Sequence, residues 1–387
     1  MENQIKNLEK VAKRILKAIK NKEKIILYGD ADLDGISSVI ILKDTIKSLN
    51  GEIAAIYFPN REEEWYGLNE KALNFLQKET PALLITLDCG IGNFNEVKKA
   101  KEIGFEVIIV DHHEILDKLP QASIIVDPKQ KGDDYPFKEF ATAGIVFELS
   151  KIILKGKLSG TLEKNFLELT ALATLADMMP QEEDNKFFIE EGLRSLDTTF
   201  RPGLKVFFEI DSLNNISVHQ VIQKIISALN TSSVVGHLNQ SFLLLTTSSS
   251  EEAKNLATDL LEKAYQKQFK IKEITERIEA RIQEKTETSI IFEGDSSLPV
   301  ISTGTVTSRI CNTYRKPTFI FKIGKKESQG AVRMPSDING VKALINCKEF
   351  LKTYGGHPRA AGFRLDNENL EKFKGCLIDY FNKHKDS

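Results

Sequence analysis

The sequence predicts an α/β protein in which a doubly wound, mostly parallel sheet is joined by a long helix to a smaller α/β domain. Apolar runs alternate with helical patterns from the N-terminus to about residue 126, and strand and helix patterns resume after residue 288. Between them, residues 250–287 contain neither glycine nor proline and are rich in helix formers. We therefore expect a first domain over 1–245, a connecting helix over 246–287 and a second domain over 288–387.

The elements of the first domain follow from the spacing of its apolar residues. Short aliphatic runs indicate buried strands, and apolar residues at every third or fourth position indicate helices. Their alternation favours right-handed crossovers and a mostly parallel sheet. Residues 141–198 read as helical, and a less regular stretch continues to 245. The expected order is helix 3–21, strand 24–29, helix 36–49, strand 52–58, helix 68–78, strand 82–87, helix 93–103, strand 105–110 and strand 123–126.

The connecting helix would be roughly 50 Å long at its usual rise per residue. Its many charges indicate a solvated helix that holds two domains at a fixed distance. The second domain is expected to contain strand 289–292, strand 299–302, helix 306–314, strand 317–323, strand 328–333, helix 339–345 and helix 368–383.

Composition limits the classes of function. A net charge of −2 and a pI near 6.4 argue against a protein that coats nucleic acid by bulk charge. Residues 288–387 nevertheless hold 16 Lys and Arg against 10 Asp and Glu, so a basic second domain could hold a polyanion. No apolar run approaches the ~18–20 residues of a membrane span, and the Lys-rich start lacks the features of a signal peptide. We expect a cytoplasmic protein that does not bind membranes.

The four cysteines lie far apart in the sequence and form no C-x-x-C pair. The sequence therefore indicates neither a zinc knuckle nor a disulfide framework. They are Cys89, Cys311, Cys347 and Cys376.

Three aspartates at alternate positions, Asp30, Asp32 and Asp34, follow the first apolar strand and precede Gly35. They would gather negative charge at the carboxyl edge of the sheet, where open α/β folds bind ligands, and a hard divalent cation would relieve the repulsion. A solvated Asp-Gly turn explains this stretch equally well when it is considered alone.

The metal hypothesis gains support from other strand ends. Asp88 ends a second aliphatic run, Asp111-His112-His113 ends a third, and Asp177 lies in an apolar helical segment. Carboxylates and imidazoles at one sheet edge, with positions open to water, suit Mn²⁺ or Mg²⁺. Two such ions that share a carboxylate form a phosphoester hydrolysis site.

Two further stretches suggest phosphate binding. In Tyr354-G-G-H-P-R-A-A-G-F, Gly355 and Gly356 permit close backbone approach to a ligand, and His357 and Arg359 supply donors. Arg61, in an exposed loop after the second strand, is either an idle surface charge or a phosphate clamp beside the metal edge.

An ordered set of motifs resembles the DHH/DHHA1 phosphoesterases and, within them, the RecJ-like single-strand nucleases. The similarity covers most of the chain. The motifs are D-A-D-L-D-G at 30–35, P-N-R…Y-G-L at 59–68, D-C-G-I at 88–91, D-H-H at 111–113, D-P at 127–128, L-A-T-L-A-D-M-M-P at 172–180, R-P-G-L at 201–204, T-S-R at 307–309 and G-G-H-P-R-A-A-G-F at 355–363.

The resemblance implies a nuclease domain, a long helix and a smaller substrate-binding domain, with a centre of two Mn²⁺ ions between the domains and Mg²⁺ as the alternative metal. By position, Asp32 would bind one ion, Asp34, His112 and Asp177 would bind the other, and Asp88 would bridge them.

Other roles are implied in the same way. His113 would lie near the scissile phosphate as an orienting or proton-handling group, and Asp30 belongs to the motif with a less definite role as a ligand. Arg61 matches an arginine that contacts a 5′-phosphate. Residues that match the phosphate-binding patches of the second domain are Arg309, Arg333, Gly355, Gly356, His357 and Arg359.

The chain also departs from the family pattern. The family often has a histidine where this chain has Tyr28, which leaves open whether the first metal is held more loosely or by Asp30. Ala331 replaces a serine near the phosphate-binding arginine, and residues 228–233 lack the arginine of an N-A-A-G-R segment. We expect the C-terminal OB-type domain of bacterial RecJ enzymes to be absent and the grip on long strands to be weaker. A replication or repair protein could replace it.

These observations favour a metal-dependent exonuclease that acts on single-stranded DNA from its 5′ end, with RNA as an open alternative. A second hypothesis is a phosphodiesterase for short oligoribonucleotides, 3′-phosphoadenosine-phosphate or cyclic dinucleotides. A third is a catalytically silent replication scaffold, which the retained metal ligands disfavour.

Overall fold

The computed structural model describes residues 4–61, 63–115, 118–210, 213, 216–284, 289–335 and 338–383. The chain forms two compact units, Met1–Ala264 and Tyr265–Ser387, each with its own five-stranded sheet. A helix, α11 (Ser250–Gln283), runs across this division. It lies where the sequence predicts the connecting helix, of which residues 285–287 are outside the described part.

The sheet of the first unit has the order β2-β1-β3-β4-β5, and all neighbouring strands are parallel. The chain leaves β1 toward β2 on one side and returns to β3 on the other. Ligands bind at the carboxyl ends of the strands where the order reverses in this way. The predicted doubly wound fold is confirmed. The strands are β1 (Ile25–Gly29), β2 (Ala55–Tyr57), β3 (Ala82–Leu87), β4 (Phe105–Val110) and β5 (Ile124–Val126).

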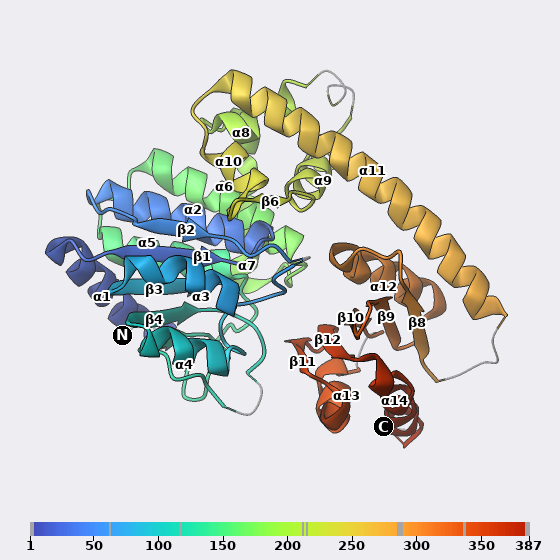
Figure 1. Cartoon of the computed structure of the whole chain (residues 1–387). Helices are drawn as coiled ribbons and strands as arrows, with labels where there is room; N and C mark the ends of the chain where they lie inside the picture. Colours follow the sequence, from blue (N-terminus) through green and yellow to red (C-terminus); the bar gives the residue numbers. More distant parts are fainter. Residues whose placement is uncertain are drawn as a thin grey trace. The chain divides into compact units, whose positions relative to one another are not determined.

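Helices cover both faces of this sheet (Figure 1). In β1, Ile25 and Leu27 belong to one apolar cluster, and Ile26 and Tyr28 belong to the cluster on the opposite face. Burial on both faces explains why the strands read as continuous apolar runs. The first cluster includes residues of α1 (Leu8–Asn21), α2 (Leu33–Ser48), α5 (Thr142–Leu154) and α6 (Gly160–Ala176), and the second includes residues of α3 (Glu70–Leu76) and α4 (Phe94–Glu102).

The rest of the first unit is more regular than its sequence suggested. A helix, α9 (Val218–Leu229), begins with a capping box in which Ser217 and Gln220 bond each other's backbone amides. Its apolar residues Val221, Ile222 and Ile225 are buried in the first cluster. The other elements are α7 (Glu183–Arg194), α8 (Pro202–Lys205), β6 (Val234–Val235), β7 (Leu238–Asn239) and α10 (Gln240–Thr246).

The sheet of the second unit has the order β11-β12-β10-β9-β8 and is antiparallel except for the β8–β9 pair. Its elements are β8 (Ile291–Asp295), α12 (Val300–Tyr314), β9 (Thr318–Ile323), β10 (Glu327–Arg333), α13 (Gly340–Asn346), β11 (Thr353–His357), β12 (Ala360–Asp366) and α14 (Leu370–Lys383).

Three expectations for this unit are corrected. The predicted strand over 299–302 is wrong, because Pro299 caps α12 and the β-branched residues after it form the first helical turn. The glycine-rich stretch is a β11–β12 hairpin, for which no strands were predicted. Cys347 and Cys376 form a disulfide, although they are 29 residues apart in the sequence. Sequence distance did not reveal that the fold brings them together.

Among the described residues, no helix combines the length and apolar character needed to cross a membrane.

Candidate metal centre

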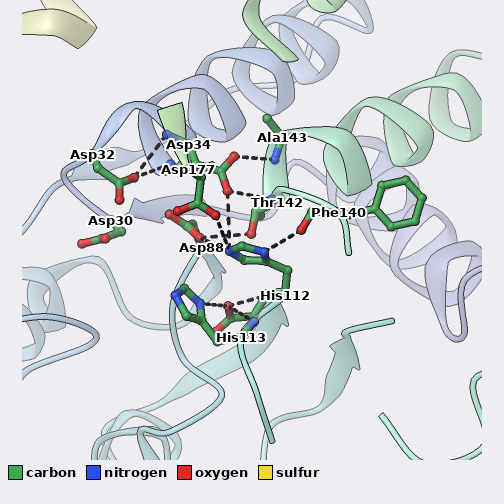
Figure 2. Close-up of polar contacts among 12 residues, drawn as sticks. Asp30, Asp32, Asp34, Asp88, His112, His113, Phe140, Thr142, Ala143 and Asp177 are labelled. Atoms are coloured by element: carbon green, nitrogen blue, oxygen red, sulfur yellow. Dashed lines mark hydrogen bonds and ion pairs between the residues drawn. The ribbon is translucent and has the colours of Figure 1, made fainter. Parts of the chain in front are cut away.

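Three neighbouring strands of the first unit deliver the acidic residues to one edge. Gly29 pairs with Leu87, and Leu87 pairs with Val110, so β1, β3 and β4 end in register. The residues that follow these ends are Asp30, Asp88 and Asp111. Parallel pairing therefore gathers groups that are far apart in the sequence (Figure 2).

The N-terminus of α2 supplies two more carboxylates. Asp32 is its N-cap and accepts hydrogen bonds from the amides of Asp34 and Gly35. The Asp34 carboxylate lies against the start of α5, where it accepts bonds from the amides of Thr142 (2.7 Å) and Ala143 (2.8 Å). The positive end of a helix dipole favours a carboxylate in this place. Asp34 is thus both buried and fixed in orientation.

Asp88 has an unusual backbone conformation. Its φ is 63°, a left-handed value that is uncommon for a residue other than glycine. Its Oδ1 accepts a hydrogen bond from the Thr142 hydroxyl at 3.2 Å. Strained backbone of this kind concentrates at functional sites, so the conformation supports a role for the Asp88 carboxylate beyond packing.

His112 is oriented for ligation through Nε2. Its Nδ1 lies 2.6 Å from the carbonyl oxygen of Phe140, which can only accept, so Nδ1 carries the proton and donates. The lone pair of a neutral ring is then on Nε2, which lies 3.2 Å from Asp88 Oδ1, 3.5 Å from Asp177 Oδ2 and 3.8 Å from Asp34 Oδ2. Burial, followed by the charge of His113, lowers the pKa of His112 well below its usual value. A neutral imidazole with a bonded Nδ1 is the form that binds metals.

The carboxylates repel one another in this buried position. Burial, then Asp32, raises the pKa of Asp34 to about 7. Burial, then Asp34 and Asp32, raises the pKa values of Asp88 and Asp177 well above the usual range. Asp177 caps the end of α6, and its buried Oδ2 receives no hydrogen bond from the described residues. A bound cation would stabilise all of these anions together.

The donor set fits divalent metal ions. Ligand atoms of Asp34, His112 and Asp177 lie within 4.8 Å of one another, as do those of Asp30, Asp32 and Asp88. Oxygen-rich sets with an imidazole suit Mn²⁺ and Mg²⁺. The structure thus brings together all six residues that the sequence proposed as ligands. Which of them bind a metal, and with what roles, stays a prediction.

Asp111 organises the residues around it rather than joining these two sets. It accepts hydrogen bonds from the amides of Ile91 and His112 and lies 2.8 Å from His113 Nδ1. Burial opposes its ionisation, but His113 and the surrounding bonds lower the pKa of Asp111 to about 2. Burial also opposes protonation of His113, yet Asp111 raises the pKa of His113. The pair favours an imidazolium beside the acidic cluster.

Arg61 contacts the acidic cluster directly. Its Nε donates to Asp30 at 3.0 Å, and its Nη2 pairs with Asp30 and lies 2.9 Å from Asp32. The sequence left open whether Arg61 is a surface charge or a phosphate clamp. The structure excludes an idle surface charge, and it places the guanidinium on two of the proposed metal ligands.

Sequence reasoning missed several residues that shape this site. The Tyr66 hydroxyl lies 3.0 Å from the Asp88 carbonyl, to which it donates, and 3.1 Å from His113 Nδ1. Its only sequence signal was its place in the Y-G-L motif. Thr142 and the Phe140 carbonyl gave no signal, because the segment that contains them reads as packing. Asn230 accepts a bond from the Leu33 amide, which fixes the start of α2 from a distant segment.

Tyr28 has a structural role. Its hydroxyl donates to the Gly67 carbonyl at 2.8 Å and accepts a hydrogen bond from the side-chain amide of Asn69 at 3.1 Å. Its ring stacks on Tyr57. It therefore supports the segment that carries Tyr66. Its contacts are with this segment and the apolar core.

Of the residues of the second unit that the sequence proposed as phosphate contacts, two lie on one face of the sheet. Arg333 and His357 both pair with Ala360, on opposite sides of β12, so their side chains share one face of the sheet. Arg333 also donates to the Ser308 hydroxyl of α12 at 2.9 Å. Arg309 is exposed on that helix, and Arg359 is exposed in the hairpin turn.

The two glycines of this stretch, Gly355 and Gly356, have different surroundings in the structure. Gly356 has a φ of 127°, and a Cβ there would lie 2.5 Å from the Ala360 carbonyl oxygen. Gly355 has open space at the same position. The close approach at Gly356 is therefore to β12, within the hairpin itself.

Comparisons with known proteins agree with the resemblance seen in the sequence. Residues 24–174 match the DHH family, N-terminal domain. Over 97% of its length, the chain is 31% identical to the single-stranded-DNA-specific exonuclease RecJ of Bacillus subtilis (strain 168), covering 48% of that protein. It is 29% identical to the RecJ of Thermus thermophilus, covering 54% of it. The chain thus spans about half the length of these curated relatives.

A solved structure gives the same result in three dimensions. The crystal structure of exonuclease RecJ bound to manganese matches with a TM-score of 0.77 at 26% identity. The match covers 98% of this chain and 95% of that one. The predicted resemblance to DHH phosphoesterases of the RecJ type is confirmed.

Proposed function

Because the chain carries a DHH-family domain over residues 24–174 and resembles RecJ exonucleases along 97% of its length, we propose that it is a metal-dependent exonuclease. Its proposed substrate is single-stranded DNA, with RNA as the alternative, degraded from the 5′ end. The proposed cofactor is a pair of Mn²⁺ ions, which Mg²⁺ could replace. The observation that carries the proposal is the convergence of two ligand sets, Asp30/Asp32/Asp88 and Asp34/His112/Asp177, at the strand-order reversal.

Asp88 is the proposed bridge between the ions. It belongs to the first ligand set, and its Oδ1 is 3.2 Å from His112 Nε2 of the second. Ions held there would activate water and neutralise charge on the attacked phosphate. Thr142 holds Asp88 Oδ1 by a hydrogen bond, and the amides of α5 hold Asp34. These residues keep the ligands in place before substrate arrives.

His113 is the proposed proton-handling group. Asp111 accepts the bond from Nδ1 and favours the protonated ring. In hydrolysis the oxygen of water bonds to phosphorus, the bond to the leaving 3′ oxygen breaks, and that oxygen takes up a proton. A protonated His113 can supply this proton and regain one from the attacking water. Tyr66 steadies the ring through its hydroxyl and its edge-to-face contact.

The proposal is tested with purified protein, Mn²⁺ and end-labelled DNA and RNA as dinucleotides, pentanucleotides and long strands. We expect stepwise shortening of long single-stranded DNA from the 5′ end. A clear preference for dinucleotides would favour the short-substrate phosphodiesterase, and no turnover would favour a scaffold role.

The variant Asp88→Asn should abolish turnover with every substrate, because the proposed bridging carboxylate would position both ions. Asp197→Asn, an exposed aspartate elsewhere in the first unit, is the matched control and should be as active as the parent. Activity of Asp88→Asn within about tenfold of the parent would contradict the assignment of the bridge.

A further inference from the structure

The middle of α11 differs in composition from both of its ends. Residues 263–272, K-A-Y-Q-K-Q-F-K-I-K, contain four lysines, two aromatic residues and no acidic residue. By contrast, residues 251–262 hold four acidic residues and one lysine, and residues 273–284 hold four acidic residues and two arginines. We call residues 263–272 the Lys-aromatic segment.

The two aromatic side chains of this segment are exposed. Tyr265 and Phe269 are 67% and 68% accessible, whereas Ala264 and Ile271 of the same segment are buried. Tyr265 and Phe269 are four residues apart, so they are neighbours on the helix surface, on the side away from the buried residues. The exposed Lys270 and Lys272 flank Phe269.

A solvated connecting helix does not need this arrangement. Its polar face would be stable with charged pairs such as Lys272–Glu276 alone. Two large aromatic rings that stay about two-thirds accessible add little stability to the fold, because most of their surface remains in solvent. Within the segment no acidic residue would repel a polyanion, and Glu262 and Glu273 border it.

We propose that the Lys-aromatic segment is a binding surface for single-stranded nucleic acid, with bases stacked on Tyr265 and Phe269 and phosphates near Lys270 and Lys272. This inference rests on the proposed single-strand nuclease function and adds a contact for the strand that does not involve the proposed metal ligands. Aromatic rings bind any base by stacking, and lysines bind the backbone, so the surface would be sequence-tolerant.

The first experiment measures binding without turnover. Fluorescence anisotropy of a labelled long oligothymidylate is recorded in EDTA for the parent, Tyr265→Gln/Phe269→Gln and Phe187→Gln. Phe187 is an aromatic residue of α7, 52% exposed, and serves as the matched control. We expect the double variant to bind at least about tenfold more weakly, since each stacked base contributes measurably. The control should bind like the parent.

The contribution of the lysines is measured separately, by the salt dependence of binding. For single strands, the slope of log K against log salt should decrease by about 0.7 for each lysine contact removed, so Lys270→Gln/Lys272→Gln should lower it by about 1.4. A strand containing 5-iodouracil should also cross-link to the peptide that contains Tyr265.

The outcomes separate this inference from the proposed function. Binding that weakens only in the double variant supports the inference even if the parent hydrolyses no substrate with Mn²⁺. Retained dinucleotide hydrolysis in the double variant would show an intact centre. No strand binding by the parent, or equal binding by parent and double variant, would overturn the inference. Equal binding together with loss of self-association or of a protein partner would assign the surface to a protein.

Discussion

Arg61 is the residue at which sequence and structure lead to different chemistry. The resemblance placed it at a 5′-phosphate, whereas the structure pairs it with Asp30 and Asp32. Both partners are carboxylates from the first proposed ligand set, and the guanidinium holds both of them at once. A divalent ion that takes these carboxylates would therefore compete with Arg61, and the displaced guanidinium would be available to a terminal phosphate.

This competition gives a prediction for Arg61→Gln. The variant should bind Mn²⁺ several-fold more tightly in a calorimetric titration, because a competing cation is gone. Its KM should rise more for 5′-phosphorylated strands than for 5′-hydroxyl strands, by roughly 1.5–3 kcal/mol of lost charge-assisted bonding. Arg61→Lys keeps the charge but loses the forked donors of the guanidinium, so its metal affinity and its KM should lie between those of the parent and Arg61→Gln. Equal weakening of both strands with lower metal affinity would mean that Arg61 only supports the structure.

Asp127 gives a prediction about pH. Burial, then the charge of Asp111, raises the pKa of Asp127 to about 8. The folded state keeps a proton that the unfolded state has lost, so this group stabilises the fold at low pH. That contribution is lost as the pH rises from about 4 to about 8.

The variant Asp127→Asn cannot ionise, so its free energy of unfolding should fall less than that of the parent over this range. We expect the difference between the two pH dependences to be on the order of a few kcal/mol in urea unfolding with EDTA present. Asp197→Asn is the control and should follow the parent. Parallel curves for Asp127→Asn and the parent would show that the carboxyl ionises normally.

Residue identities in the site were predictable because strand ends are visible in the sequence. Asp30, Asp88 and His112 each follow an apolar run, and parallel strands bring such ends together. The partners that orient them were not predictable. Phe140 contributes only its carbonyl oxygen to His112, and Ala143 only its amide to Asp34. Every residue has a backbone carbonyl and every residue except proline has an amide N–H, so only the folded path of the chain reveals which ones act here.

At the scale of elements, prediction succeeded where burial on both faces gave unbroken apolar runs, as in β3 and β4, whose observed bounds equal the predicted ones. It also located β9, β10, α13 and α14 of the second unit to within two residues, but it failed at two stretches of that unit where tertiary contacts decide the structure. Val300 and Ile301 read as a strand but begin α12. No strand was predicted at Gly355 and Gly356, which lie in β11 because pairing with β12 overrides the low strand propensity of glycine.

Substitutions at Gly355 and Gly356 can distinguish a structural role in the hairpin from a role in binding a ligand. Gly356→Ala should destabilise the hairpin by on the order of 1–3 kcal/mol, because it combines a positive φ with a clash against β12. Gly355→Ala has open space and should unfold like the parent. Urea unfolding measures both. If Gly355→Ala instead lowers affinity for single-stranded DNA at unchanged stability, the ligand-approach interpretation holds at that position.

For the whole molecule, the proposed metal ligands and most of the proposed phosphate contacts belong to different units, with Arg61 as the exception. All the candidate metal ligands belong to Met1–Ala264, whereas Arg333, His357 and Arg359 belong to Tyr265–Ser387. The division falls within α11, while the predicted domain borders lie at its two ends. Sequence alone identified a long helix but not the residue at which packing changes from one unit to the other, since that depends on side-chain contacts along both halves.

Because all the candidate ligands belong to the first unit, the effect of a metal on each unit tests the proposed centre. A metal that binds only the folded state stabilises it by about 2.7 kcal/mol at a concentration 100 times its Kd. The gain should appear in the first unit, because Asp34, Asp88 and Asp177 lose their mutual repulsion there. Hydrogen exchange with and without Mn²⁺ should therefore show new protection in peptides that contain the ends of β1, β3 and β4. Peptides of β9, β10 and β12 should exchange at unchanged rates.

The Asp88→Asn variant controls for nonspecific effects of the ion and should lose the protection. Equal protection in both units, or protection retained in the variant, would place the ions elsewhere and contradict the proposed centre.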